Sequence, residues 1–289
     1  MMKILINFIV LCSLIIGQAE YQILTLPKNL FQLSTNGGLS SIPNQNNYFN
    51  PATYKNKKNN YGFSLIQYPS DIMMLNLNTN KFSLSILDYG NFIDQEYDTV
   101  HKKFTSNEVL LQYFYKHTIK KVNIGISIGG FYSKIYTYNS YGLTSSIGIN
   151  SYYKKINTYL GLSIENFGNV LKPYISYRTP MPVKYRLSIN HNINTLLLGY
   201  DILYSKNSDQ LQYILCLRFK ISKKINLIIS NSSYSADLNI EEDELSIFSG
   251  FSSGLNINLN SISLDLGFKN IGIAGFVYGM SLNFKLNNF

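Results

Sequence analysis

The sequence predicts an all-β fold: a transmembrane antiparallel β-barrel of the bacterial outer membrane, with fourteen strands and an N-terminal segment that plugs it. Three observations lead to this prediction. The chain starts with the features of a secretory signal, no later apolar stretch is long enough for a transmembrane helix, and many short stretches alternate between apolar and polar residues. An alternating strand has one apolar and one polar face, as a barrel between lipid and a wet lumen requires.

Residues 1–19 carry the signal. Lys3 precedes a mostly apolar run, and Gly17-Gln18-Ala19 provides a small-residue cleavage site. The run is too short to span a bilayer comfortably, so we expect cleavage after Ala19, with an uncleaved anchor as the alternative. Cleavage leaves one cysteine, Cys216, and an intramolecular disulfide then has no second partner.

Residues 20–60 do not alternate, and they predict a compact segment that enters or plugs the barrel. Gly37-Gly38 and Ser40-Ser41 indicate a tight passage of the backbone. The alternative is a periplasmic tail. The domain organisation that we expect is a signal peptide (1–19), an N-terminal segment or plug (20–60) and an outer-membrane β-barrel (61–289).

The connections between the alternating stretches fall into two classes that take turns along the chain. Short ones are centred on Asn78-Thr79-Asn80, Ile119-Lys120, Lys154-Lys155, Asn192-Ile193, Ser222-Lys223-Lys224 and Asn258-Leu259. Longer ones cover roughly residues 68–71, 91–106, 135–140, 166–182, 205–208, 235–244 and 269–274. Barrels of this type have short periplasmic turns and longer outside loops, so six short and seven longer connections imply fourteen strands. The loop at 68–71 has a weak turn signal, and twelve strands are the alternative.

The strands show which side chains should face lipid. Alternation is clearest in residues 122–129, 157–165, 211–220 and 261–268. A lysine on the lipid face at the midplane would cost about 2–4 kcal/mol, and the charges in these strands avoid that face. A secreted soluble β-sandwich or propeller is the alternative, although strands of about nine to thirteen residues are long for a globular sheet.

The composition suits a membrane surface better than a nucleic-acid partner. Charged residues make up 14% of the chain, and its 24 tyrosines offer an apolar ring with a polar tip for the headgroup level. The net charge is +9, but lysine pairs such as Lys120-Lys121 and Lys223-Lys224 lie in short turns, where we expect them to be solvated. No basic helix or aromatic RNA-binding signature accompanies them. We therefore expect outer-membrane lipid, and no nucleic acid, as a partner.

Several short motifs resemble the PorV/PorQ family of outer-membrane proteins, and their order and spacing are most similar to the PorQ branch. Asn50-Pro51-Ala52 follows a Gly-Gly segment just before the first strand, an element that FadL-type fatty-acid channels share. Asp88-Tyr89-Gly90 and Asn166-Phe167-Gly168 continue the resemblance, with further pieces at 68–72, 138–142, 146–150 and 180–187. Beyond residue 190 the similarity is to the barrel pattern alone.

The resemblance implies a fourteen-stranded barrel of the FadL type and a role in a type IX secretion pathway. In that pathway PorV-like barrels shuttle cargo and hold a surface protease, and PorQ-like barrels anchor a surface attachment component. The residues that carry the family motif are Asn50, Pro51, Ala52, Asp88, Tyr89, Gly90, Asn166 and Gly168.

The sequence shows no catalytic or metal-binding constellation. His101, His117 and His191 are dispersed without a partner at metal-ligand spacing, and no histidine is placed to activate a serine nucleophile. The acidic run 241–244 lacks the glycine pattern of a calcium loop and predicts a solvated loop. We expect no enzyme activity, no cofactor and no metal.

Two arginines on predicted strands, Arg186 and Arg218, are candidates for ion pairs in the lumen. An arginine in a membrane-spanning strand should face the lumen and pair with a carboxylate such as Glu165 or Asp265. A structural ion pair is the simpler interpretation, and a constriction that selects anions is the alternative.

Two functional hypotheses follow. The first is a non-enzymatic scaffold or component of a type IX-like secretion system, whose loops at 91–106 and 166–182 meet a surface partner through aromatic residues such as Tyr174 and Tyr177. The second is a FadL-like channel for hydrophobic small molecules. The lumen distinguishes them, because an apolar cleft favours a channel and a lumen filled by polar pairs favours a scaffold.

Overall fold

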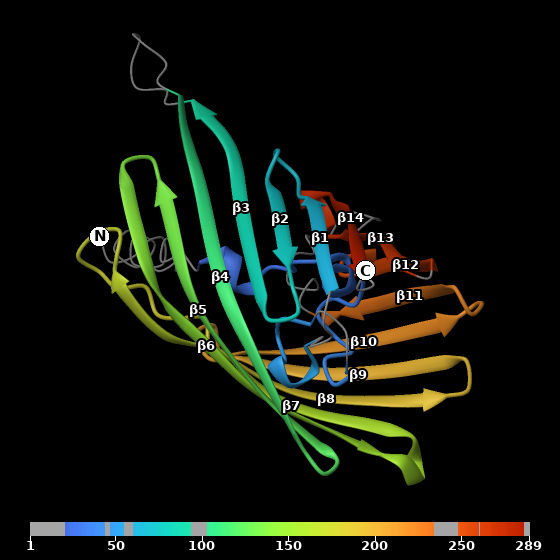
Figure 1. Ribbon diagram of the computed structural model, residues 1–289. Coiled ribbons are helices and arrows are strands. Elements are labelled where there is room, and N and C mark those ends of the chain that lie inside the picture. Colours follow the sequence, from blue (N-terminus) through green and yellow to red (C-terminus); the bar gives the residue numbers. More distant parts are fainter. Residues whose placement is uncertain are drawn as a thin grey trace, which may run out of the picture.

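Fourteen antiparallel strands close into a barrel in the computed structural model, with β14 hydrogen-bonded to β1 (Figure 1). The structure describes residues 21–43, 47–54, 60–93, 103–233, 248–259 and 261–285. The strands are β1 (Asn60–Gln67), β2 (Met73–Asn78), β3 (Phe82–Ile93), β4 (Lys103–Ile119), β5 (Val122–Ile135), β6 (Tyr138–Tyr153), β7 (Thr158–Lys172), β8 (Lys184–Ile193), β9 (Leu196–Ser205), β10 (Gln210–Lys220), β11 (Ile225–Ser232), β12 (Ser252–Leu259), β13 (Ile262–Asn270) and β14 (Phe276–Lys285). The predicted fold class and the count of fourteen are confirmed. The signal peptide, His101 and the acidic run 241–244 lie outside the described residues.

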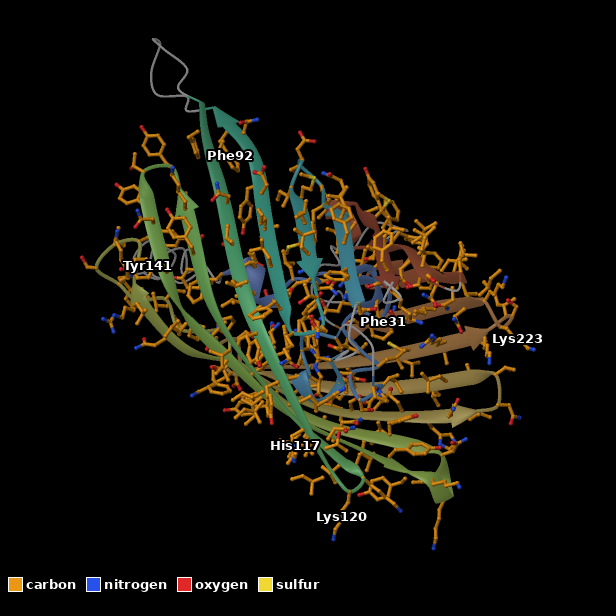
Figure 2. All side chains as sticks on the ribbon, viewed as in Figure 1. Phe31, Phe92, His117, Lys120, Tyr141 and Lys223 are labelled. Carbon is orange, nitrogen blue, oxygen red and sulfur yellow. The ribbon has the colours of Figure 1, made fainter. Side chains whose placement is uncertain are left out.

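The two classes of connection lie at opposite ends of the barrel, which we name the short-turn end and the long-loop end. At the short-turn end, 120–121 joins β4 to β5 and 194–195 joins β8 to β9, while η2 (Lys154–Ile156) starts the turn between β6 and β7. At the long-loop end, 173–183 joins β7 to β8, and η5 (Gly272–Ala274) lies between β13 and β14. Figure 2 shows Lys120 and Lys223 at the short turns, away from Phe92 and Tyr141.

One predicted loop is wrong. Residues 135–140 form no long connection, because Ile135 pairs directly with Tyr138 and only two residues join β5 to β6. Tyr136 takes up the tight reversal with a φ of 55°. Two-residue hairpins normally use Asn or Gly at such positions, so this turn carries no sequence signal.

The outer surface of the barrel is apolar, and the inner surface is polar except where apolar wall residues pack against the N-terminal segment. On β5 the side chains of Ile124 and Ile128 are exposed, whereas Ser127 between them is fully buried. On β6 two exposed tyrosines, Tyr141 and Tyr153, stand twelve residues apart on the outer face. At about 3.3 Å per residue and a strand tilt of about 40°, they flank a band roughly 30 Å tall, close to the apolar band that outer-membrane barrels present to lipid.

The N-terminal segment, here residues 21–43 and 47–54, lies inside the barrel (Figure 1). It contains α2 (Gln22–Thr25), α3 (Leu30–Ser34) and η1 (Pro51–Thr53). It descends from Tyr21, which contacts β6 at the long-loop end, to Tyr54, whose hydroxyl donates to the carbonyl of Thr79 in a short turn. In the described part of the chain, no helix is both long and apolar enough to cross a membrane.

Candidate functional site

In the long-loop half of the lumen, apolar side chains of the N-terminal segment and of the wall pack together, and we name this region the apolar chamber. Ile23, Leu24 and Leu30 of the segment are fully buried. They belong to one cluster with wall residues Leu87, Leu110, Phe131 and Val170. Tyr21 packs its ring 4.5 Å from that of Phe131, measured between centroids. The segment and the wall therefore bury each other's apolar side chains in this region.

Polar contacts fix the segment at the top of this chamber. The Glu108 carboxylate accepts the backbone N–H of Ile23 at 2.8 Å and the hydroxyl of Tyr89 at 3.2 Å. Tyr21 and Ser140 share a hydrogen bond of 2.6 Å. Burial raises the pKa of Tyr21 and raises the pKa of Tyr174 in the neighbouring loop to about 12, so both phenols stay neutral donors at physiological pH.

A buried ion network joins the middle of the segment to three strands. Arg186 Nε on β8 lies 2.6 Å from Glu165 Oε1 on β7, and Arg186 Nη1 lies 3.7 Å from Asp201 Oδ2 on β9. Arg186 Nη1 also donates to the carbonyl of Gly37 at 2.8 Å. Asp201 accepts from Ser40 Oγ at 2.6 Å. The structure thus brings the two candidates Arg186 and Glu165 together, and it adds Asp201 and the segment to the pair.

The Asn-Pro-Ala element anchors the lower part of the segment. Asn50 Oδ1 accepts the backbone N–H of Ala52 at 3.1 Å and so caps η1, which begins with Pro51. The wall leaves no room beneath it: a β-carbon on Gly125 would lie 2.3 Å from the nitrogen of Ala52, and one on Gly148 would lie 2.0 Å from Asn50 Oδ1. Gly125 and Gly148 of the wall therefore leave the space that this motif occupies.

The other motif residues shape the wall around the segment. Asp88 accepts the N–H of Gly90, which has a φ of 79° at the bulge between β3 and β4. Asn166 has a φ of 57°, and its side chain donates to the carbonyl of Leu24 at 3.1 Å. A β-carbon on Gly168 would lie 2.0 Å from the carbonyl oxygen of Leu143.

The second predicted ion pair, Arg218 with Asp265, is not formed in the described part of the chain, and the two side chains have different surroundings. Asp265 on β13 accepts the side-chain amides of Asn256 at 2.6 Å and Asn283 at 3.3 Å. Arg218 instead lines a cavity of about 370 Å³ near the short-turn end. Within the described residues, Arg218 and Asp265 form no direct ion pair.

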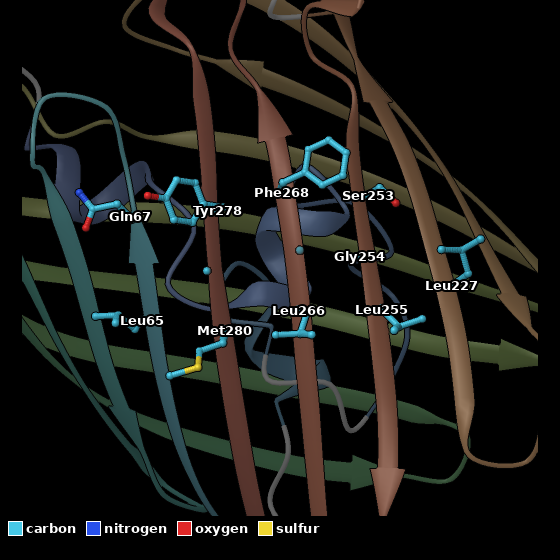
Figure 3. Close-up of a pocket in the computed structure, with 12 residues that line it drawn as sticks. Leu65, Gln67, Leu227, Ser253, Gly254, Leu255, Leu266, Phe268, Tyr278 and Met280 are labelled. Carbon is cyan, nitrogen blue, oxygen red and sulfur yellow. The ribbon is translucent and has the colours of Figure 1, made fainter.

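A depression of about 620 Å³ lies on the outer face (Figure 3). Its lining includes the exposed side chains of Leu266, Phe268 and Tyr278, and the wall behind it is thinned by Gly254, Gly267 and Gly279, which pair across β12, β13 and β14. Figure 3 shows the N-terminal helices behind this wall. In a bilayer, lipid chains cover this face.

Two histidines, His117 and His191, lie in the described part of the chain. His191 Nδ1 lies 2.8 Å from Thr158 Oγ1 on the neighbouring strand, and His117 stands near the end of β4. Among the described residues, no group of three or more His, Cys, Asp or Glu side chains is placed to hold a metal ion.

Sequence reasoning missed Glu108 and Asp201. Both stand in the polar phase of alternating strands, and the rule that a charge in such a strand faces the lumen and finds a partner applies to each. Each has a partner on a neighbouring strand, Tyr89 for Glu108 and Arg186 for Asp201, and a second partner, Ile23 or Ser40, in a segment without sequence periodicity. The sequence therefore gives the direction of these side chains but not their contacts.

Comparison of the fold with solved structures finds a toluene transporter, a FadL homologue and a monoaromatic hydrocarbon channel. The Pseudomonas putida toluene transporter TodX is similar with a TM-score of 0.55 and 10% sequence identity, over 91% of this chain and 99% of that one. A FadL homologue of Pseudomonas aeruginosa is similar with a TM-score of 0.52 and 11% identity, over 91% and 99%. The CymD monoaromatic hydrocarbon channel is similar with a TM-score of 0.50 and 12% identity, over 91% and 100%.

These likenesses and the apolar exterior define the class of protein: an outer-membrane β-barrel. More particularly, its fold is the fourteen-stranded type seen in FadL-like transporters. The predicted outer-membrane location is confirmed. No family model and no curated protein matches the sequence, so the narrower resemblance to PorV/PorQ has no support from sequence comparison. At such low identity the structural likeness shows the fold alone.

Proposed function

We propose that this protein is a non-enzymatic channel that lets small hydrophobic molecules cross the outer membrane, gated by its N-terminal segment. The observation that carries the proposal is the apolar chamber at the long-loop end, where Ile23, Leu24 and Leu30 occupy the space. An apolar solute entering there replaces apolar side chains, and the polar groups released at the top, such as Glu108, must then bind water. The FadL-like fold is consistent with this role, since the similar solved structures include a toluene transporter.

We propose that movement of the N-terminal segment opens and closes the path through the barrel. The segment runs through the interior from the chamber to a short turn, so we expect a solute to pass only when part of the segment moves. Its hold at the top depends on a few polar contacts, chiefly that of Ile23 with Glu108. The ion network around Arg186 holds the middle more firmly. Opening should therefore begin with the upper part, from Tyr21 to Leu30, and a path to the short turns should need the middle of the segment, around Gly38, to leave the wall as well.

Uptake of radiolabelled toluene tests the proposal. The full chain is expressed in a Gram-negative host whose own channels for hydrophobic compounds are deleted, and glycerol serves as the polar solute. We expect faster toluene uptake than in cells with the empty vector and unchanged glycerol uptake. Toluene uptake equal to that of the empty vector would contradict the proposal.

One substitution tests the gate within this assay. Glu108→Gln keeps the shape of the side chain but removes the charge that strengthens its hydrogen bonds. Losing about 1 kcal/mol from the docked state should raise toluene uptake about fivefold. Asp209→Asn, at an exposed connection where Asp209 binds only the Tyr204 hydroxyl among the described residues, is the matched control and should leave uptake unchanged.

A scaffold in a type IX-like secretion system is the second candidate. The network of Glu165, Arg186 and Asp201 fills the middle of the lumen with polar pairs, as a barrel without a transport path would be filled. This candidate predicts a surface protein bound at the long loops. Affinity capture from crosslinked outer membranes of the native organism tests it, and recovery of no surface protein would remove it.

A further inference from the structure

A cavity of about 370 Å³ opens between the N-terminal segment and the barrel wall near the short-turn end. Its size is at the lower end of the range of small-molecule pockets, about 300–1,000 Å³. The segment contributes Ile42. The wall contributes Tyr159, Asn192, Asn194, Thr195, Leu197, Arg218, Lys220, Lys223 and Asn226.

The cavity is strongly positive. Three of its lining residues, Arg218, Lys220 and Lys223, are cationic, and none is acidic. The carboxylate with an electrostatic influence on Arg218 is that of Asp265, whose two oxygens accept the amides of Asn256 and Asn283. The remaining polar lining consists of amides and a hydroxyl, which donate hydrogen bonds as well as accept them.

The two lumen arginines differ in what they bind. Arg186 is satisfied by Glu165, Asp201 and the carbonyl of Gly37. Within the described residues, no protein group accepts a hydrogen bond from the guanidinium of Arg218, although this side chain is only partly exposed. A guanidinium carries five donors in a planar fork that matches a carboxylate or phosphate, and it is costly to leave unpaired away from bulk water.

We infer that this cavity binds a small anion through its oxyanion group, a carboxylate or a phosphate held by Arg218. Lys220 and Lys223 supply further positive charge at the rim, and the amides of Asn192 and Asn194 supply neutral donors. Ile42 and Leu197 form an apolar side of the cavity, which accommodates a small organic group attached to the oxyanion. The site is separate from the apolar chamber, and the inference does not depend on hydrophobic transport.

Calorimetric titration of the detergent-solubilised full chain tests this inference, with sodium benzoate and sodium phosphate as separate probes and benzyl alcohol as the neutral analogue. We expect saturable binding of at least one anion and none of benzyl alcohol. Binding of benzoate alone identifies an organic carboxylate as the better ligand, and binding of phosphate alone identifies free phosphate. Saturation by neither anion, at any concentration reached at constant ionic strength, would overturn the inference.

Substitutions assign the binding to this cavity. Arg218→Gln should weaken the affinity at least tenfold, whereas Arg178→Gln, on an exposed loop at the opposite end, should leave it unchanged. Lys223→Gln changes only an exposed turn residue, which keeps the test valid if Arg218→Gln folds poorly, and it should weaken binding about threefold. Equal affinity in Arg218→Gln, Lys223→Gln and the unaltered chain would also overturn the inference.

Discussion

At the scale of single residues, the lumen is held together by charges and by missing side chains. Arg186 is the centre of the charged part, since its guanidinium lies within ion-pair distance of Glu165 and Asp201 and donates to the carbonyl of Gly37. Glycines form the other part, because η1 rests on wall positions where a β-carbon would collide with its backbone. The middle of the segment is thus held by charged hydrogen bonds, and its lower part at η1 is held by close packing against the wall.

Removing the central charge should destabilise the barrel strongly. Arg186→Gln leaves two buried carboxylates without their cation, and breaking a buried pair in this way costs about 3–5 kcal/mol. We expect a matching fall in the free energy of unfolding, measured by urea denaturation in detergent. Arg178→Gln, on an exposed loop, should change this free energy by less than about 0.5 kcal/mol. Equal stabilities of the two variants would show that the network contributes nothing.

Two glycines of one strand make a matched test of the close fit. Gly125→Ala places a methyl group against the backbone of Pro51 and Ala52 and should cost about 1–3 kcal/mol. Gly130→Ala, on the same strand, meets nothing nearer than 3.9 Å and should be neutral or slightly stabilising. Urea denaturation of both variants gives the comparison. A Gly125→Ala variant as stable as Gly130→Ala would mean that η1 does not rest on the wall.

At the scale of elements, the strands could be predicted from the sequence and the contacts of the segment could not. Alternation in the sequence predicted which side chains of β5 face lipid, because the apolar Ile124 points outward and the polar Ser127 points into the lumen. The tight turn at Tyr136 was not predicted, because a tyrosine rarely adopts a positive φ and no Asn or Gly marks the turn in the sequence. The partners of Arg186 were half predictable: Glu165 stands in the polar phase of its strand, whereas Gly37 belongs to a segment without periodicity.

The segment also carries a titratable group whose effect depends on pH. The ammonium of Lys28 lies 5.9 Å from the ring centroid of Tyr48 and 5.7 Å from that of Phe49. Burial lowers the pKa of Lys28 from 10.5 to about 8. Between pH 8 and 10.5 the unfolded chain therefore binds a proton that the folded chain has lost, so the contribution of Lys28 to stability rises with pH in this window.

Lys28→Met tests this contribution. At pH 7.5 the variant should be more stable than the unaltered chain, by up to about 3 kcal/mol, because it removes the cost of burying a charge. The difference should shrink by pH 9.5, where the folded chain already holds a neutral amine. Urea midpoints of both chains at the two pH values provide the measurement. A difference that is the same at both values would contradict the low pKa.

At the scale of the whole molecule, the barrel is a lipid-facing cylinder with an occupied interior. Apolar side chains cover its exterior, and the N-terminal segment runs from the apolar chamber to the short turns (Figures 1 and 2). The cylinder itself follows from the sequence pattern. Its function does not, because the chamber is built from residues that lie far apart in the sequence, such as Leu24, Phe131 and Val170.

A reversible lock between segment and wall tests the gating account most directly. A β-carbon on Gly38 would lie 2.7 Å from the sulfur of Cys216 on β10, so Gly38→Cys places a second thiol where a disulfide with the native cysteine can form. Toluene uptake is then measured with the disulfide formed and again after reduction, and Gly38→Cys combined with Cys216→Ser is the control. The account predicts that uptake falls to the level of the empty vector in the oxidised protein and recovers on reduction. Undiminished uptake through the oxidised, locked protein would contradict it.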